Sequence, residues 1–224
     1  KMRPGTTFSD GTPIAVDDVI WTFNWTMNPK VEAPRDRAYL GKIRSVTKSG
    51  DNEVTFEFNE PYFDALLLAG SMNILPQHFY SKYSPEDFNK STGLLLGSGP
   101  YRMVDPTKWA PGQQVELVRN ERYWGVQPGF NRLVYRMIDN DLARLTTFRN
   151  GDLDYFPAQP EQYQKLLDDK DVQARANHFE YDTAISGYRY IAWNEQRGGK
   201  PTRFASKRVR QAMTLLTDKD RICR

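Results

Sequence analysis

The sequence predicts a mixed α/β fold, in which short helices and short strands alternate along a chain of 224 residues. Apolar residues at helical spacing follow a turn at Asp10-Gly11. Alternating apolar and polar residues flank a polar turn at 49–52, which is the pattern of a β-hairpin. Further strand-like and helix-like segments follow one another through the second half. This order, without an internal repeat or a low-complexity segment, is typical of an α+β or α/β protein.

The composition is that of a folded chain with a mixed surface. Hydrophobic residues make up 39% and aromatic residues 13%, which is enough for a packed core. Lys and Arg number 31 and Asp and Glu number 28, so the formal net charge is +3. Nucleic-acid binding is not expected, because it requires basic residues concentrated on one face. The short basic cluster at residues 203–210 is interpreted as a solvated helix face.

Residues that carry metal or nucleophilic chemistry are scarce. Cys223 is the only cysteine, which excludes an intrachain disulfide and a cysteine metal cluster. His78 and His178 are the only histidines, and they lie far apart in the sequence. We therefore predict no catalytic residues, no metal site and no cofactor. No apolar run approaches the ~20 residues that span a bilayer, and no signal segment is recognised.

The first part of the chain predicts one long helix, one hairpin and several short helices. The long helix begins near Pro13 and ends at Asn28-Pro29, and Asp17-Asp18 in its first turn complement the helix dipole. Its expected buried stripe is Val16, Val19, Ile20, Phe23 and Met27. A loop is predicted at 30–41, hairpin strands at 43–47 and 54–58, and short helices at 65–69, at 78–83 and after Ser84-Pro85.

The second part predicts strands joined by turns and short helices. Residues 97–101, Gly-Ser-Gly-Pro-Tyr, form a connection into a strand, and they lack the Lys and the helix of a phosphate-binding loop. Asp141 is expected to cap a helix over 142–149 that Gly151 closes. Strands are predicted at 101–104, 114–119, 133–138 and 153–156, a helix at 160–167, and extended chain at 172–181.

Residues 187–212 predict a strand, a turn-rich break and a helix. Aromatic and β-branched residues alternate from Tyr188 to Trp193, which suits a pleated strand that Asn194 ends. Gly198, Gly199 and Pro201 then interrupt regular structure. Ser206 is the expected N-cap of the helix, whose apolar stripe is Val209, Ala212, Met213 and Leu216.

Several motifs, taken in order, resemble those of family 5 extracellular solute-binding proteins, the oligopeptide, dipeptide and nickel receptors of bacterial ABC importers. Phe8 to Pro13 followed by Asp17-Asp18-Val19 resembles the family's F-S-D-G-x-P…x-D-V, and residues 97–101 resemble its G-T-G-P-Y with Ser98 in place of Thr. The remaining motifs are NERYWG at 120–125, Asn150 to Asp154, Trp193-Asn194, RVRQA at 208–212 and Thr217 to Lys219. The family's Pro-Phe-Asp before R-V-R is replaced here by Phe204-Ala205-Ser206.

The resemblance implies a type II periplasmic-binding-protein fold with two lobes that close on a ligand. We expect residues 1–97 to form most of an extra subdomain of the first lobe, 98–193 part of that lobe, and 194–224 the start of the second. Because the chain begins at Lys1, we expect it to be an internal fragment, with the second lobe largely missing. The implied protein is a monomeric receptor, periplasmic or lipid-anchored outside the cell, that delivers its ligand to a membrane permease.

Four residues are predicted to contact the ligand. Tyr190 and Trp193 offer flat apolar surfaces, and the Asn194 amide offers donors and an acceptor. The alternative is that Tyr190 belongs to the core and Asn194 only caps the strand. Gln159, in a loop before a helix, is a second candidate for the rim of the cleft.

Two other functions stay open at this point. A hydrolase acting on a similar ligand would need a nucleophile with a base, a carboxylate pair or a metal cluster, and the sequence shows no such arrangement. A structural or docking role for the extra subdomain is the third hypothesis. The ligand itself, whether a peptide, a nickel complex, an oligosaccharide or an opine, is not predicted.

Overall fold

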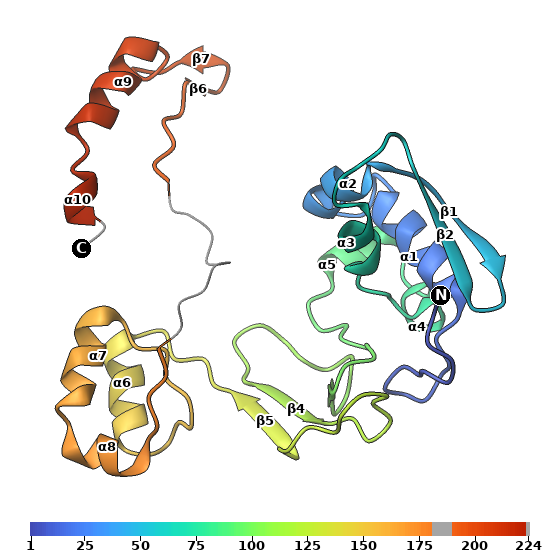
Figure 1. The fold of residues 1–224 in the computed structure, drawn as a ribbon, viewed down its shortest axis with the longest axis horizontal. Coiled ribbons are helices and arrows are strands. Elements are labelled where there is room, and N and C mark those ends of the chain that lie inside the picture. The colour runs from blue at the N-terminus through green and yellow to red at the C-terminus, as the bar shows by residue number, and fades with distance from the viewer. Residues whose placement is uncertain (181–189, 223–224) are drawn as a thin grey trace. The chain divides into compact units, whose positions relative to one another are not determined.

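The computed structural model describes residues 1–180 and 190–222. The chain divides into two compact units, Lys1–Phe156 and Pro157–Arg224, and each is described by itself (Figure 1). The predicted strand residues Tyr188 and Arg189, and the single cysteine Cys223, lie outside the described residues. The predicted boundaries at 97 and 193 concern lobes rather than these units, and they stay predictions.

The predicted long helix is confirmed as α1, Val16–Met27. Of its apolar stripe, Val16, Val19 and Phe23 are buried. Asp18 is buried as well, and its two carboxylate oxygens accept hydrogen bonds from the N–H groups of Ala15 at 2.8 Å and Gln77 at 2.9 Å. The carboxylate therefore both caps α1 and ties it to a distant segment, which is more than the dipole role expected for it.

The predicted hairpin is confirmed, with strands β1, Ile43–Gly50, and β2, Glu53–Phe58, that extend beyond the expected ranges. They pair in antiparallel register, with Val46 opposite Phe56. One face of the hairpin packs on α1 in a core of buried residues, namely Val19, Phe23, Leu40, Ile43 and Val46 (Figure 1). This core holds the first half of the unit together, because its members come from three separate elements.

Helix α2, Pro34–Leu40, replaces the loop predicted at 30–41. Its sequence is polar and only Leu40 is buried, so no apolar periodicity marks it. Pro34 at the helix start was the available signal, because its fixed φ suits a first turn. The guanidinium of Arg37 donates to the carbonyl oxygens of Asn28 and Val31, which fixes α2 to the end of α1.

Three further short helices follow the hairpin: α3, Ala65–Gly70, α4, Gln77–Tyr80, and α5, Pro85–Lys90. All three were predicted, and α4 is shorter than expected. Ser84 caps α5 by accepting a hydrogen bond from the Asp87 N–H at 3.1 Å.

The predicted strands of the second half form one antiparallel sheet in the order β3, Tyr101–Met103, β4, Val115–Arg119, and β5, Arg132–Tyr135. Asn120, only 1% exposed, follows β4 directly. Its Nδ2 donates to the Gly99 carbonyl at 2.8 Å, and its Oδ1 accepts from the Arg122 N–H at 3.1 Å. The Gly-Ser-Gly-Pro-Tyr and NERYWG motifs thus meet around one buried amide.

Helix α6, Asp141–Arg149, is confirmed with one correction, because Asn140 and not Asp141 is its cap. The Asn140 side chain accepts from the Ala143 N–H at 2.9 Å. Gly151 closes the helix as predicted, with φ of 86°. The predicted strand at 153–156 is wrong: no described segment pairs with it, and Phe156 instead stacks on Phe148 at 5.3 Å.

The second unit begins with α7, Pro160–Leu167, whose bounds are those predicted. Helix α8, Lys170–Arg175, falls within the segment predicted to be extended, so that prediction is wrong for 172–175. The Asp169 side chain accepts from the N–H groups of Asp171 and Val172. This cap, with the single buried apolar residue Val172, starts a helix that has no apolar periodicity.

The region after residue 189 contains a small hairpin and two helices. Strands β6, Gln196–Arg197, and β7, Lys200–Pro201, are joined by Gly198 and Gly199, with φ of 58° and 74°. Two consecutive positive φ values define the tight hairpin turn that glycine permits. Helices α9, Lys207–Leu216, and α10, Lys219–Ile222, follow, and α9 begins after Ser206 as predicted.

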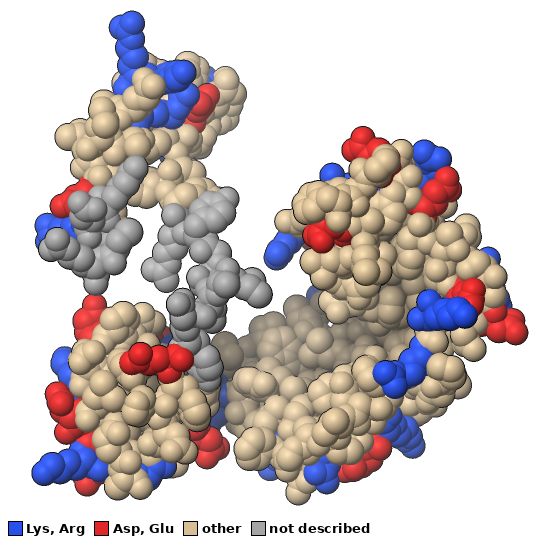
Figure 2. Space-filling view, in the orientation of Figure 1, with Lys and Arg blue, Asp and Glu red and all other residues tan. Residues whose placement is uncertain are grey.

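Charged side chains of both signs are interspersed on the visible surface of each part, as the balanced composition predicts (Figure 2). Among the described helices, none combines the length and the apolar character needed to cross a membrane.

Candidate ligand-contact segment

The predicted ligand residues Tyr190, Trp193 and Asn194 lie in an irregular segment. Residues 190–195 form no strand with any described segment, so the predicted strand is wrong over these positions. A strand requires a partner for its backbone, and alternation alone supplies none. Tyr190 is 75% exposed, which excludes the alternative that it belongs to the core of the described chain.

Hydrogen bonds to the small hairpin hold the segment around Asn194. The Thr202 hydroxyl donates to the Asn194 carbonyl oxygen, and the Thr202 N–H donates to the Glu195 carbonyl oxygen at 2.9 Å. The Trp193 ring lies 4.9 Å from the ring of Phe204, centroid to centroid. The backbone of 194–195 and the Trp193 side chain are therefore fixed by residues that follow them.

An arginine of α9 completes this support. Arg210 forms an ion pair with Glu195 at 2.8 Å and donates to the carbonyl oxygens of Phe204 and Ala205 at 2.8 and 3.0 Å. Arg210 belongs to the RVRQA motif, so the structure assigns that residue a positioning role that the sequence did not indicate. The side chain is mostly buried against these partners, at 26% exposure.

The Asn194 amide is exposed and only partly used within the chain. Its Oδ1 accepts from the Gln196 N–H at a long 3.3 Å. Among the described residues, no acceptor is recorded for its Nδ2 group. The amide thus has donors available, which is what a ligand carbonyl would require.

Gln159 occupies the N-cap position of α7. Its backbone N–H donates to the Gln162 Oε1 at 3.0 Å, and its carbonyl oxygen accepts the first hydrogen bonds of the helix. The backbone of Gln159 is thus used to start α7, and its side chain is exposed. Residues 160–189 separate Gln159 from the segment at 190–195 in the sequence.

The shifted titratable groups have structural explanations. Burial raises the pKa of the Tyr80 hydroxyl, whereas the hydrogen bond from Lys108, with others from Thr107, lowers the pKa of Asp105 to about 2. Burial acts to raise the pKa of Asp10, but hydrogen bonds from the Thr12 N–H and from His78, 2.7 Å away, outweigh it and hold the pKa below its ordinary value. The hydrogen bonds of Asp10 and Asp105 link neighbouring parts of the fold, and none of them joins a nucleophile to a base.

Metal binding finds no support in the described residues, where no group of three His, Cys, Asp or Glu side chains is placed to hold an ion. What the segment at 190–195 offers is non-covalent contact: an aromatic face, amide donors and exposed backbone.

Comparisons with known proteins agree with this fold. The chain resembles the oligopeptide-binding protein AppA from Bacillus subtilis, solved in complex with a nonapeptide, with a TM-score of 0.65 and 25% identity over 74% of this chain and 33% of that one. It also resembles NikZ from Campylobacter jejuni, solved in complex with Ni(L-His), with a TM-score of 0.57 and 26% identity over 68% of this chain and 30% of that one. AppA is an oligopeptide-binding protein by name, and NikZ was solved with a bound nickel–histidine ligand.

The model of the bacterial extracellular solute-binding proteins, family 5 Middle, matches residues 1–224, and the chain belongs to that family. The curated sequence of Bacillus subtilis AppA is 28% identical over 231 residues, covering 99% of this chain and 39% of AppA. The chain therefore spans well under half of the length of this relative. The family confirms the resemblance inferred from the motifs, and its members and structural neighbours are binding proteins.

Proposed function

We propose that the full-length protein is an extracytoplasmic receptor of an ABC importer that binds a peptide or a similar small solute and delivers it to a membrane permease. The observation that carries the proposal is the family match over the whole chain. The nonapeptide complex of AppA and the nickel–histidine complex of NikZ illustrate the ligands of similar proteins. The segment at 190–195 supports the proposal, because its exposed aromatic and amide groups suit a peptide-like ligand.

The finer assignments belong to the same proposal. Tyr190, Trp193, Asn194 and, at the rim, Gln159 contact the ligand. Residues 1–97 form most of the extra subdomain, 98–193 part of the first lobe, and 194–224 the start of the second lobe. The receptor works as a monomer, periplasmic or lipid-anchored outside the cell, and it binds without chemical turnover. Closure of two lobes over the ligand supplies the affinity.

A thermal-shift screen of the full-length protein tests the proposal. Binding to the folded state raises the melting temperature by mass action, so a class of true ligands is recognised by a concentration-dependent rise. The classes to compare are di-, tri- and oligopeptides, nickel–histidine complexes, oligosaccharides and opines. No rise with any class would contradict the receptor function. Cleavage of a peptide, detected by mass spectrometry after incubation, would favour the hydrolase instead.

Once a ligand is found, Asn194→Ala tests the predicted contact. We expect Kd to rise by about five- to tenfold, because one or two hydrogen bonds to the ligand are lost. The matched control is Asn52→Ala, in the exposed turn between β1 and β2, which should leave Kd unchanged. An equal effect of both substitutions on Kd would show that Asn194 does not contact the ligand, and it would leave the proposed receptor function unaffected.

A further inference from the structure

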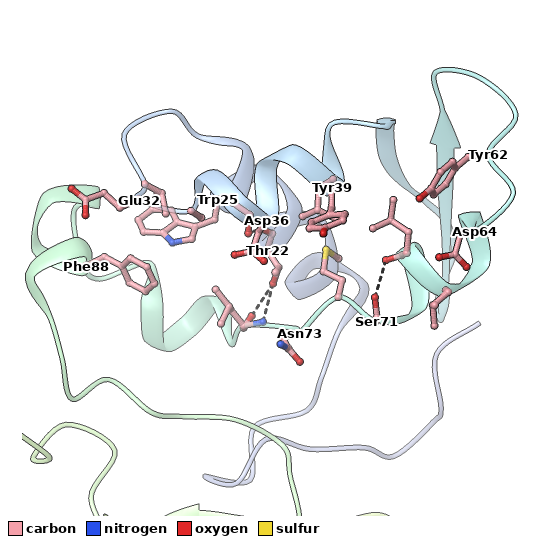
Figure 3. Close-up of a pocket in the computed structure, with 18 residues that line it drawn as sticks. Thr22, Trp25, Glu32, Asp36, Tyr39, Tyr62, Asp64, Ser71, Asn73 and Phe88 are labelled. Atoms are coloured by element: carbon pink, nitrogen blue, oxygen red, sulfur yellow. Dashed lines mark hydrogen bonds between the residues drawn. The ribbon is translucent and has the colours of Figure 1, made fainter. Parts of the chain in front are cut away.

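A groove in the first unit has the dimensions of a small-molecule site. It lies between α1, α2, α3 and the segment at 71–75, with Phe88 of α5 at one end (Figure 3). Its volume is about 540 Å³. Pockets that hold small ligands measure roughly 300 to 1,000 Å³, so the groove is large enough for one. All of its lining residues lie between 22 and 88, within the first unit.

Aromatic and aliphatic side chains form much of the lining. Trp25, Tyr39, Tyr62 and Phe88 contribute rings, and Leu67 contributes an aliphatic side chain. Tyr39 is 55% exposed and Leu67 63% exposed, so apolar surface at the groove is open to solvent. Apolar surface of this kind favours an occupant with a hydrophobic body.

One polar group of the lining has no hydrogen-bond partner. The indole Nε1 of Trp25 is buried, and no acceptor for it is present among the described residues. Its recorded ring neighbours are Trp21, stacked at 5.0 Å, and Phe88, perpendicular at 5.5 Å, and neither carries an oxygen. Because this nitrogen has no surface open to solvent, an occupant of the groove meets the ring of Trp25 and not its N–H group.

The charge of the lining is one-sided. Glu32, Asp36 and Asp64 line the groove, whereas no Lys, Arg or His does. Within the described part of the chain, none of these carboxylates has an ion pair recorded. Lys42 lies outside the lining, over the ring of Tyr62 at 4.7 Å. Carboxylates beside aromatic faces are the groups that recognise an organic cation.

We propose that this groove is a binding site for a small amphipathic organic cation, separate from the ligand-contact segment at 190–195. The ammonium group lies beside one of the carboxylates, which are spread along the groove from Glu32 to Asp64 (Figure 3), and the apolar body lies against the rings. The proposal does not depend on the receptor function, because it uses residues 22–88 alone.

A series of three phenols tests the proposal on the unaltered 224-residue chain by calorimetric or NMR titration. Tyramine carries an ammonium group, tyrosol replaces it with a hydroxyl group, and 3-(4-hydroxyphenyl)propionate replaces it with a carboxylate. We expect tyramine to bind saturably and tyrosol to bind about three- to tenfold more weakly, because each exposed carboxylate of the groove contributes modestly to the affinity. The propionate should bind more weakly still. Salt should weaken tyramine binding and leave tyrosol binding unchanged.

Variants of the lining then separate the contributions. Asp36→Asn with Asp64→Asn should lower the affinity for tyramine by about tenfold and leave tyrosol unaffected. Trp25→Leu removes one aromatic ring of the lining, so it should weaken the binding of both ligands. The matched control is Asp51→Asn, an exposed carboxylate of the β1–β2 turn that should change neither affinity.

The proposal is overturned if tyramine does not bind saturably, or if the three phenols bind equally well. Equal affinity of the Asp36/Asp64 variant and the Asp51 control for tyramine would also overturn it. If a lining variant fails to fold, the phenol series and its salt dependence on the unaltered chain still decide the outcome.

Discussion

Replacing Asn120 with alanine should destabilise the first unit more than an equivalent change at a partly exposed position. The Asn120 side chain makes two hydrogen bonds, to the Gly99 carbonyl and from the Arg122 N–H, and it is only 1% exposed. Each such bond contributes about 1 kcal/mol net, and a partner left without water costs about 1–3 kcal/mol. We therefore expect Asn120→Ala to lower the free energy of unfolding by about 2–4 kcal/mol.

Asn89 supplies the matched control. Its Nδ2 donates to the Lys30 carbonyl at 2.8 Å and its Oδ1 accepts from the Glu32 N–H at 2.9 Å, so it also joins two backbone groups. These groups are exposed, and water replaces the lost bonds, so Asn89→Ala should cost below about 1 kcal/mol. Urea unfolding followed by tryptophan fluorescence measures both changes. Equal losses in the two variants would refute the argument that burial makes the Asn120 amide important.

Three further predictions concern caps and carboxylates. Asp18→Asn should lower the free energy of unfolding in urea by about 2 kcal/mol, because the buried carboxylate loses charge-assisted hydrogen bonds. The same substitution at its exposed neighbour, Asp17→Asn, should lower it by less than about 0.5 kcal/mol. Similar losses in the two variants would contradict the capping role of Asp18. Because the pKa of Asp10 is lowered in the folded state, its contribution to stability is present above its ordinary pKa of 3.8 and is lost as pH falls through the lower folded value. Asp10→Asn should therefore make the melting temperature fall less steeply at acid pH. An unchanged pH dependence of the melting temperature would count against this role. Ser84→Ala removes a helix cap and should lower the free energy of unfolding by about 1 kcal/mol. Ser206→Ala, at an N-cap position without a side-chain hydrogen bond, should lower it by less. A larger loss for Ser206→Ala in urea unfolding would disprove this.

The sequence predicted the elements that have regular apolar spacing. Helix α1 and the β1–β2 hairpin each bury a repeating stripe or face, and the sequence of α7 is amphipathic around its one buried residue, Leu166; the positions of all three were predicted closely. Helices α2 and α8 were missed because each buries a single apolar residue, Leu40 or Val172, and depends on a proline or an aspartate at its start. Caps of this kind decide a short helix without leaving a period to detect.

The candidate sites were less predictable than the fold. Trp193 and Asn194 were selected by their resemblance to a family motif, and the sequence did not show that Thr202 bonds to the Asn194 backbone or that Arg210 pairs with the adjacent Glu195. The groove was missed altogether, because its lining is scattered over residues 22–88 and forms no motif. Only the packing of α1, α2 and α3 brings these side chains together.

The ion pair and hydrogen bonds of Arg210 have a mechanical consequence. Arg210 links α9 to Glu195, Phe204 and Ala205, so these residues are expected to follow any rotation of the helix. Trp193 is expected to move with them through the contact of its ring with Phe204. In the proposed two-lobed receptor, a closing motion that moved α9 would also move Trp193, one of the predicted ligand contacts.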